Sequence, residues 1–227
     1  MLPKVLVGCP THDGKEYCLE QYADAVKNLS YKNYDVLLAD NSKGKSYISK
    51  IRGFGINAVK TEHRVHARDR IVEGRNLLAK KAVEGYDYFL SLEQDVIPPG
   101  DVIEKLMMHG KEIVSGIYHT RQDINGQARI LPLIFVQLNE KKNQMRYLTD
   151  QEIEKINGLT EIRICGVGCL LIKKDVLEKI KFRYAKGVPG FDDVHFCNDA
   201  IAQGYKIYAD TNVRCRHFYG SWEGIRK

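Results

Sequence analysis

The sequence predicts an α/β fold with a mainly parallel central sheet flanked by helices, and three observations support this fold class. Short β-rich runs alternate with helical patterns through the first half of the chain, as in parallel βαβ units. The apolar run at 86–92 ends abruptly in Glu93 and Asp95, and two prolines then prevent its continuation as a central strand. Two β-rich runs, 131–138 and 145–148, follow each other closely and indicate a small antiparallel β element in the second half.

The start of the chain contains the first βα units. Residues 4–9 are β-rich, and the polar segment after them leads into a helical pattern over about 16–29. Residues 34–39 form the second expected strand, and 57–61 suit a short third one. Polar residues directly follow the first two of these strands.

Helix start and stop signals divide the centre of the chain. A longer helical pattern begins at about residue 68, and Gly85 stands where a helix C-terminal cap belongs. After the two prolines, Asp101 can cap a helix that runs to about residue 109. Residues 112–117 then form another expected strand.

The second half of the chain has a mixed pattern. The segment NEKKNQ separates the two β-rich runs and predicts a hairpin. The run at 162–172 is interrupted by Gly166 and Gly168, where missing side chains allow a bulge or the close approach of a ligand. The remaining expected elements are a helix over about 174–180, a helical stretch that ends at Gly204, and short strands at 206–209 and 213–217.

Length and composition favour one compact domain. The 227 residues, 44% of them hydrophobic, suffice for one substantial core. No apolar run approaches the length of a membrane span, and the start of the chain lacks a signal-peptide pattern. We therefore expect a cytoplasmic protein, with peripheral membrane contact left open. The net charge of +6 is spread without a basic block, so no nucleic-acid tail is expected.

The six cysteines form no Cys-x-x-Cys pair, and we interpret most of them as buried thiols. One set, His195, Cys197, Cys215 and His217, offers two nitrogens and two sulfurs for a tetrahedral zinc site. Residues two apart on a helix do not face each other, so the expected helical placement of His195 and Cys197 argues against this site.

Glu93 and Asp95 are expected at the carboxyl end of a strand, the edge at which open α/β sheets bind ligands. Two oxygen donors at that edge suit a hard divalent cation that carries a phosphate ligand. The alternative is that the acidic pair only closes the strand and faces water.

Six segments together resemble the nucleotide-sugar glycosyltransferases of the GT-A fold, particularly the inverting family 2 type. In chain order they are CPTHDG, ADNS, EGRN, LEQDVIPP, GVGCLLI and FDDVHFCNDAIAQGYKIYADTNVRCRH. The resemblance extends over most of the chain. It implies a single GT-A domain over 1–227, with a nucleotide-binding half at about 1–98 and an acceptor-binding half at about 99–227.

The resemblance implies a bound Mn²⁺ or Mg²⁺ that bridges the two phosphates of the sugar donor. The family's Asp-x-Asp segment corresponds here to Glu93-x-Asp95, and the departure at the first position makes Asp95 the stronger expected ligand. Glu93 is expected to ligate the metal, to reach the ribose or to act through water. His217 matches a histidine that often completes the metal shell in this family. Such an ion stabilises the charge that accumulates on a leaving nucleoside diphosphate.

The resemblance also implies a catalytic aspartate in GFDDVHF. Asp193 matches the general base, with Asp192 beside it, because an inverting transfer needs a carboxylate to take the proton from the attacking hydroxyl. The alternative is that one or both aspartates only cap the following helix. Retention of configuration also stays open, since GT-A enzymes of both outcomes share the metal motif.

Similar proteins bind the nucleotide through the loop after the first strand, the acid after the second strand and an Arg-Asn pair. On this sequence the implied residues are Pro10, Thr11, Asp13, Asp40, Arg75, Glu93 and Gln94. Tyr219 and Trp222 lie in a terminal segment whose aromatic faces can stack on a base or a sugar.

The expected function is therefore a metal-dependent glycosyltransferase that uses a UDP- or GDP-sugar and a hydroxyl of a glycan, lipid-linked or protein acceptor. The alternative from another class is a non-catalytic nucleotide- or glycan-binding module of the same fold. A sugar-phosphate nucleotidylyltransferase fits less well, because its glycine-rich start, resembling G-G-x-G-T-R, is missing from CPTHDGKEY. No RNA-binding or helix-turn-helix signature supports a nucleic-acid partner.

Overall fold

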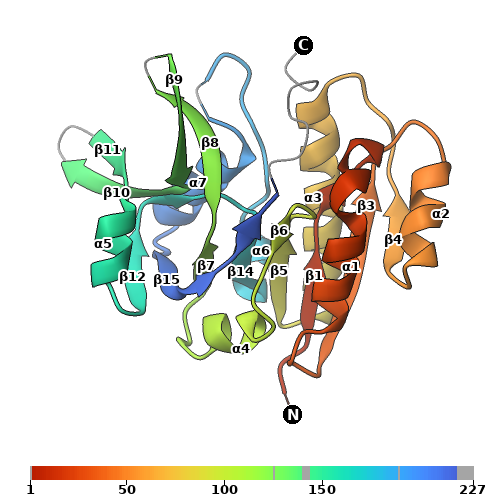
Figure 1. Ribbon diagram of the computed structural model, residues 1–227, viewed down its shortest axis with the longest axis horizontal. Coiled ribbons are helices and arrows are strands. Elements are labelled where there is room, and N and C mark those ends of the chain that lie inside the picture. The colour runs from red at the N-terminus through yellow and green to blue at the C-terminus, as the bar shows by residue number, and fades with distance from the viewer. Residues whose placement is uncertain (1, 125, 140–143, 189, 219–227) are drawn as a thin grey trace.

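The computed structural model of the protein describes residues 2–124, 126–139, 144–188 and 190–218 (Figure 1). The strands are β1 (Val5–Gly8), β2 (Pro10–Thr11), β3 (Tyr34–Asp40), β4 (Asn57–Lys60), β5 (Tyr88–Leu92), β6 (Val96–Ile97), β7 (Ile113–Ile117), β8 (His119–Ile124), β9 (Gln127–Pro132), β10 (Ile134–Asn139), β11 (Gln144–Tyr147), β12 (Leu159–Ile162), β13 (Ile164–Cys165), β14 (Cys169–Lys173), β15 (Ile207–Arg214) and β16 (Arg216–His217). The helices are η1 (Asp13–Cys18, a 3₁₀ helix), α1 (Leu19–Lys27), α2 (Ser46–Gly53), α3 (Ala67–Gly85), α4 (Val102–Met107), α5 (Asp150–Lys155), α6 (Lys174–Lys179) and α7 (Asp192–Ala202).

The main sheet has the strand order β12-β15-β7-β14-β5-β1-β3-β2, with β4 also paired to β3. β1 is parallel to β3 and β5, β3 is parallel to β2 and β4, and β7 is parallel to β15. β14 runs antiparallel between β5 and β7, and β12 runs antiparallel along β15. The mainly parallel sheet that the sequence predicts is confirmed.

Helices cover both faces of this sheet. Val5 and Val7 of β1 pack in one core with buried residues of α1, α2 and α4. Leu6 packs in a second core with buried residues of α3, α6 and α7. Because side chains alternate along a strand, β1 is buried on both faces, which explains its continuous apolar sequence. No helix in the described part of the chain is long and apolar enough to cross a lipid bilayer.

The antiparallel element predicted in the second half is also present. β10 and β11 are antiparallel, with Phe135 opposite Tyr147, and β13 pairs with the other edge of β10. A second hairpin, β8 and β9, projects from the body of the molecule (Figure 1). The sequence did not predict β8, because its side chains alternate between exposed and half-buried positions without an apolar face.

The run at 162–172 is not a single strand. It is divided between β12, β13 and β14, and the turn between β13 and β14 contains Gly166 and Gly168. The Gly168 N–H donates to the Tyr118 hydroxyl at 3.0 Å, and a Cβ on Gly168 would lie 2.7 Å from Tyr118 Cζ. The sequence suggested a bulge or the close approach of a ligand at these glycines, and the structure places the Tyr118 side chain against them.

Other boundaries differ where local signals are weak. The helix expected over 16–29 begins as η1. The strand expected at 206–209 is the start of β15, and the one expected at 213–217 is divided between the end of β15 and β16. Helix α5 was not predicted, although Thr149 and Glu152 form a capping box at its start. Such a pair three residues apart is a helix-start signal that sequence reasoning can use.

Candidate functional site

Polar side chains gather at one edge of the main sheet, where the adjacent parallel strands β1, β3 and β5 end. Thr11 follows β1 in β2, Asp40 is the last residue of β3, and Asp95 follows β5. All three residues are buried. The carboxyl ends of adjacent parallel strands share an edge, so the topology brings these residues of the predicted site together.

Asp95 is fully buried in the turn between β5 and β6. Its Oδ2 atom pairs with Lys15 Nζ and lies 3.4 Å from both Tyr17 Oη and His217 Nε2. Its Oδ1 atom is buried and has no hydrogen-bond partner among the described residues. Burial raises the pKa of Asp95, but the hydrogen bond from His217 and the charge of Lys15 outweigh burial and lower it. Asp95 is therefore an ionised carboxylate with one oxygen still available.

Strand pairing places His217 beside Asp95. β16 is antiparallel to β6, with His217 opposite Val96. His217 Nδ1 lies 2.7 Å from the His119 carbonyl oxygen, which can only accept, so Nδ1 carries a proton and Nε2 faces Asp95. Burial lowers the pKa of His217, but the hydrogen bond and negative charge of Asp95 outweigh burial and raise it.

Arg75 connects three elements through a buried guanidinium that is only 1% exposed. Nε donates to Asp192 Oδ2 at 2.7 Å, Nη1 to Ser91 Oγ at 2.8 Å and Nη2 to Glu93 Oε1 at 2.9 Å. The resemblance implied a place for Arg75 near the nucleotide base and pyrophosphate. The structure places its guanidinium between Glu93, whose side chain is 33% exposed, and Asp192, which is buried.

The Gln94 side chain connects the turn after β5 to residues in the N-terminal part of the chain. Its Oε1 accepts from Thr11 Oγ1 and from Tyr47 Oη, the latter at 2.9 Å. Its Nε2 donates to the Lys15 carbonyl oxygen at 2.7 Å. These contacts are internal to the protein, so Gln94 orients its two acidic neighbours through the turn that all three share.

The end of β3 forms a second polar cluster. Asp40 Oδ1 accepts from the Ser42 N–H at 2.9 Å, and Asp40 Oδ2 pairs with Lys60 Nζ at 3.0 Å. Asn41 Oδ1 is buried without a partner among the described residues. The exposed Asp13 joins this cluster through its backbone, since its N–H donates to Ser42 Oγ at 2.9 Å. Pro10 packs beside Gly74, where an added Cβ would lie 3.1 Å from Pro10 Cβ.

Asp192 and Asp193 occupy the first turn of α7. Asp192 Oδ1 accepts from the Asp193 N–H at 3.1 Å, and Asp193 Oδ1 accepts from the Val194 N–H at 2.7 Å. Burial and the negative charge of Asp192 raise the pKa of Asp193 to about 6. Asp192 is paired with Arg75, so the two neighbouring carboxylates have different environments. A buried carboxyl group with a raised pKa is a candidate for a functional role, although structural ion-pair networks also perturb pKa values.

The structure does not assemble the four residues considered for zinc. In the described ranges no three His, Cys, Asp or Glu side chains gather as a metal-binding group. Cys197 Sγ contacts the Cys165 carbonyl oxygen, and His217 contacts Asp95. The predicted aromatic residues Tyr219 and Trp222 lie outside the described residues.

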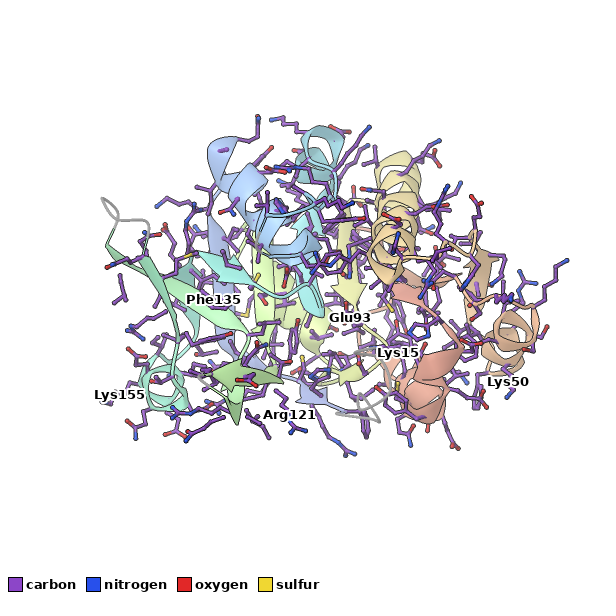
Figure 2. The ribbon with its side chains drawn as sticks, turned by 90° about the horizontal axis from the view of Figure 1, so that it is seen from above. Lys15, Lys50, Glu93, Arg121, Phe135 and Lys155 are labelled. Carbon is purple, nitrogen blue, oxygen red and sulfur yellow. The ribbon has the colours of Figure 1, made fainter. Side chains whose placement is uncertain are left out.

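Sequence reasoning missed Lys15, Tyr17 and Lys60, which contact the predicted carboxylates of the site. Lys15 and Tyr17 belong to η1, where no periodic pattern points to a partner. Lys60 reaches Asp40 because β4 pairs with β3 in a register that places these two residues opposite each other. Seen from above, Lys15 lies close to Glu93 near the middle of the molecule (Figure 2).

Solved structures share this fold. No protein-family model matches the sequence, and no curated protein sequence matches it. GalNAc-T7 with UDP, GalNAc and Mn²⁺ superposes with a TM-score of 0.71 at 15% identity, over 96% of this chain and 44% of that one. The mannosyltransferase PcManGT from Pyrobaculum calidifontis, in complex with GDP-Man and Mn²⁺, has a TM-score of 0.65 at 15% identity. That match covers 100% of this chain and 60% of PcManGT.

A third similar structure is S. aureus TarS 1–349 in complex with UDP-GlcNAc, with a TM-score of 0.58 at 12% identity, over 99% of this chain and 61% of that one. The chain thus has the GT-A fold of nucleotide-sugar glycosyltransferases, as the resemblance implied. It spans well under two thirds of the length of GalNAc-T7 and somewhat under two thirds of PcManGT.

Proposed function

We propose that the protein is a metal-dependent glycosyltransferase that moves a sugar from a UDP- or GDP-sugar to a hydroxyl acceptor. The observation that carries this proposal is the buried Asp95 carboxylate at the carboxyl edge of a GT-A sheet, whose Oδ1 has no partner in the described part of the chain. A buried charged oxygen without a partner is unfavourable unless a ligand satisfies it. The solved neighbours that hold UDP or GDP-Man with Mn²⁺ support this class of ligand.

Asp95 and His217 suit Mn²⁺ or Mg²⁺. One buried carboxylate and one imidazole are few protein ligands for a divalent ion. Such a site fits an ion whose other ligands are diphosphate oxygens and water. The contact from Nδ1 to the His119 carbonyl orients the ring so that Nε2 faces Asp95, the arrangement that metal-binding histidines commonly have. When bound, the ion supplies Lewis-acid stabilisation of the leaving diphosphate. Glu93 faces the same region and is assigned to the metal or the ribose.

The nucleoside is assigned to the cluster at the end of β3. The buried Asp40 is held rigidly by Ser42 and Lys60, and the unpartnered Asn41 Oδ1 offers an acceptor for a base or ribose donor. The neighbouring loop contains Pro10, Thr11 and Asp13. Gln94 and Arg75 support the donor site indirectly, by holding its acidic residues in place. In this proposal residues 1–98 carry most of the donor site, and residues 99–227 supply the acceptor site.

Asp193 is proposed as the general base, because a pKa of about 6 leaves it deprotonated at neutral pH and still basic enough to accept a proton. The acceptor oxygen attacks the anomeric carbon while its proton passes to Asp193 and the bond from sugar to diphosphate breaks. Direct displacement of this kind inverts the anomeric configuration. Arg75 holds Asp192 beside the base through an ion pair of 2.7 Å between Arg75 Nε and Asp192 Oδ2.

A thermal-shift panel tests this proposal. UDP, GDP and CDP, each with Mn²⁺, Mg²⁺ or EDTA, are added to the wild-type protein and to Asp95→Asn. A ligand that binds only the folded state raises the melting temperature, so a rise for one nucleotide that needs the metal and Asp95 supports the donor site. No rise with any nucleotide contradicts it.

A second assay measures release of the nucleoside diphosphate from the nucleotide-sugar. It distinguishes an enzyme from a non-catalytic binding module. Slow transfer of the sugar to water requires no known acceptor. An enzyme releases the diphosphate at a rate that falls in Asp193→Asn, whereas a binding module binds the conjugate and leaves it intact.

A further inference from the structure

The ammonium group of Lys15 contacts the carboxylate of Asp95, the predicted metal ligand. Its Nζ pairs with Asp95 Oδ2, and its side chain is 16% exposed while that of Asp95 is 0% exposed. The negative charge of Glu93 also acts on this ammonium group. Lys15 therefore faces, from η1, both acidic residues that follow β5.

The backbone of Lys15 is held firmly. Its N–H donates to the His12 carbonyl oxygen at 2.8 Å, and its own carbonyl oxygen accepts from Gln94 Nε2 at 2.7 Å and from Cys18 Sγ at 3.2 Å. Because Gln94 lies between Glu93 and Asp95, the turn that carries the lysine is tied to the turn that carries the carboxylates. The four-carbon stem can still swing between acceptors, since a lysine ammonium has three rotatable donors.

The two oxygens of Asp95 have unequal surroundings. Lys15, Tyr17 and His217 all approach Oδ2, whereas Oδ1 is the oxygen without a partner among the described residues. A divalent ion bound to Oδ1 would share the Asp95 carboxylate with the Lys15 ammonium group. The two cations would then repel each other. A diphosphate brings negative charge that both cations can contact.

We propose that Lys15 is a second cation of the donor site: its ammonium neutralises Asp95 in the empty protein and turns to a diphosphate oxygen when the nucleotide binds, which leaves Asp95 to the divalent ion. This inference rests on the proposed function and adds a residue that touches the leaving group. The departing diphosphate is then stabilised by an ammonium as well as by the ion. Lys15 opposes the binding of Mn²⁺ alone and favours the binding of the nucleotide.

Isothermal titration of three proteins tests this inference. They are the wild type, Lys15→Gln, which removes the charge but keeps a hydrogen-bond donor, and Lys50→Gln as a matched control. Lys50, in α2, pairs at 2.5 Å with Glu16, the neighbour of Lys15 in η1, and its side chain is 51% exposed. It lies toward one end of the molecule, away from Lys15 and Glu93 (Figure 2). Mn²⁺ is titrated alone, and UDP and GDP are then titrated at saturating Mn²⁺.

Lys15→Gln is expected to bind Mn²⁺ alone more tightly than the wild type. It is expected to bind the nucleoside diphosphate about ten- to hundredfold more weakly, the range for one lost hydrogen bond from a charged group. Lys50→Gln is expected to match the wild type in both titrations. Unchanged nucleotide affinity in Lys15→Gln, or weaker binding of Mn²⁺ alone, overturns the inference.

The wild-type protein provides a second measurement that does not depend on how the variant folds. In EDTA, the diphosphate of the preferred nucleoside is expected to bind more tightly than the corresponding monophosphate, because Lys15 contacts the additional phosphate. Equal affinities overturn the inference. If the wild type binds neither UDP nor GDP, the proposed function fails together with this inference. If it binds one of them and Lys15→Gln binds it equally well, only the inference fails.

Discussion

Replacing Arg75 with methionine removes the guanidinium that pairs with both Asp192 and Glu93. The Asp192 side chain is 3% exposed, so the substitution leaves a buried carboxylate without its ion-pair partner. Removing one member of a buried ion pair typically destabilises a protein by about 3–5 kcal/mol. For a domain of this size each 1 kcal/mol lowers the melting temperature by about 2–4 °C, so the expected loss is about 6–20 °C.

Urea denaturation followed by circular dichroism measures this free energy of unfolding. Arg183→Met is the control, because Arg183 is likewise paired with a carboxylate, making two hydrogen bonds of 2.7 Å to Asp199, but its side chain is 52% exposed. An exposed pair contributes about 0.2–1 kcal/mol. The double variant Arg75→Met/Asp192→Asn is expected to be more stable than Arg75→Met alone, since it removes the stranded charge. A loss in Arg75→Met no greater than that in Arg183→Met would refute this reasoning.

The remaining predictions concern the proposed reaction. Asp193→Asn is expected to lower the transfer rate by about 10²- to 10⁴-fold, the contribution of a lost general base, with nucleotide affinity unchanged by calorimetry. The wild-type rate should rise with pH through about 6, because Asp193 is protonated and inactive as a base below its raised pKa; a flat pH–rate profile contradicts the assignment. Asp95→Asn is expected to keep the fold but to abolish Mn²⁺-dependent stabilisation by nucleotides in a thermal-shift assay, and retained stabilisation would exclude Asp95 as a metal ligand.

The sequence predicts the parts of this structure that depend on local patterns. The apolar run before Asp95 and the prolines after it were sufficient to place this carboxylate at the carboxyl end of a strand. The hairpin of β10 and β11 was likewise visible as two β-rich runs with a polar segment between them. The resemblance correctly implied the GT-A fold.

Contacts between distant parts of the chain were harder to predict. His217 lies beside Asp95 because the two-residue strands β16 and β6 pair, and strands this short carry no periodic signal. Lys15 and Arg75 gain their partners only through tertiary packing, so an arginine in a helix pattern could not be distinguished from a solvated one. The roles of Pro10, Thr11 and the other predicted binding residues stay predictions.

The position of β14 has a consequence for the synthesis of the chain. β14 covers the edge of β5 but is encoded much later in the sequence, after β7 and both hairpins. At about 5–20 residues per second, a growing chain therefore exposes the backbone edge of β5 for several seconds before its partner leaves the ribosome. An apolar strand with an open edge is prone to pair with other chains. The first 98 residues are thus expected to aggregate when expressed alone, and the nascent protein is expected to need chaperone protection until Lys173 has emerged.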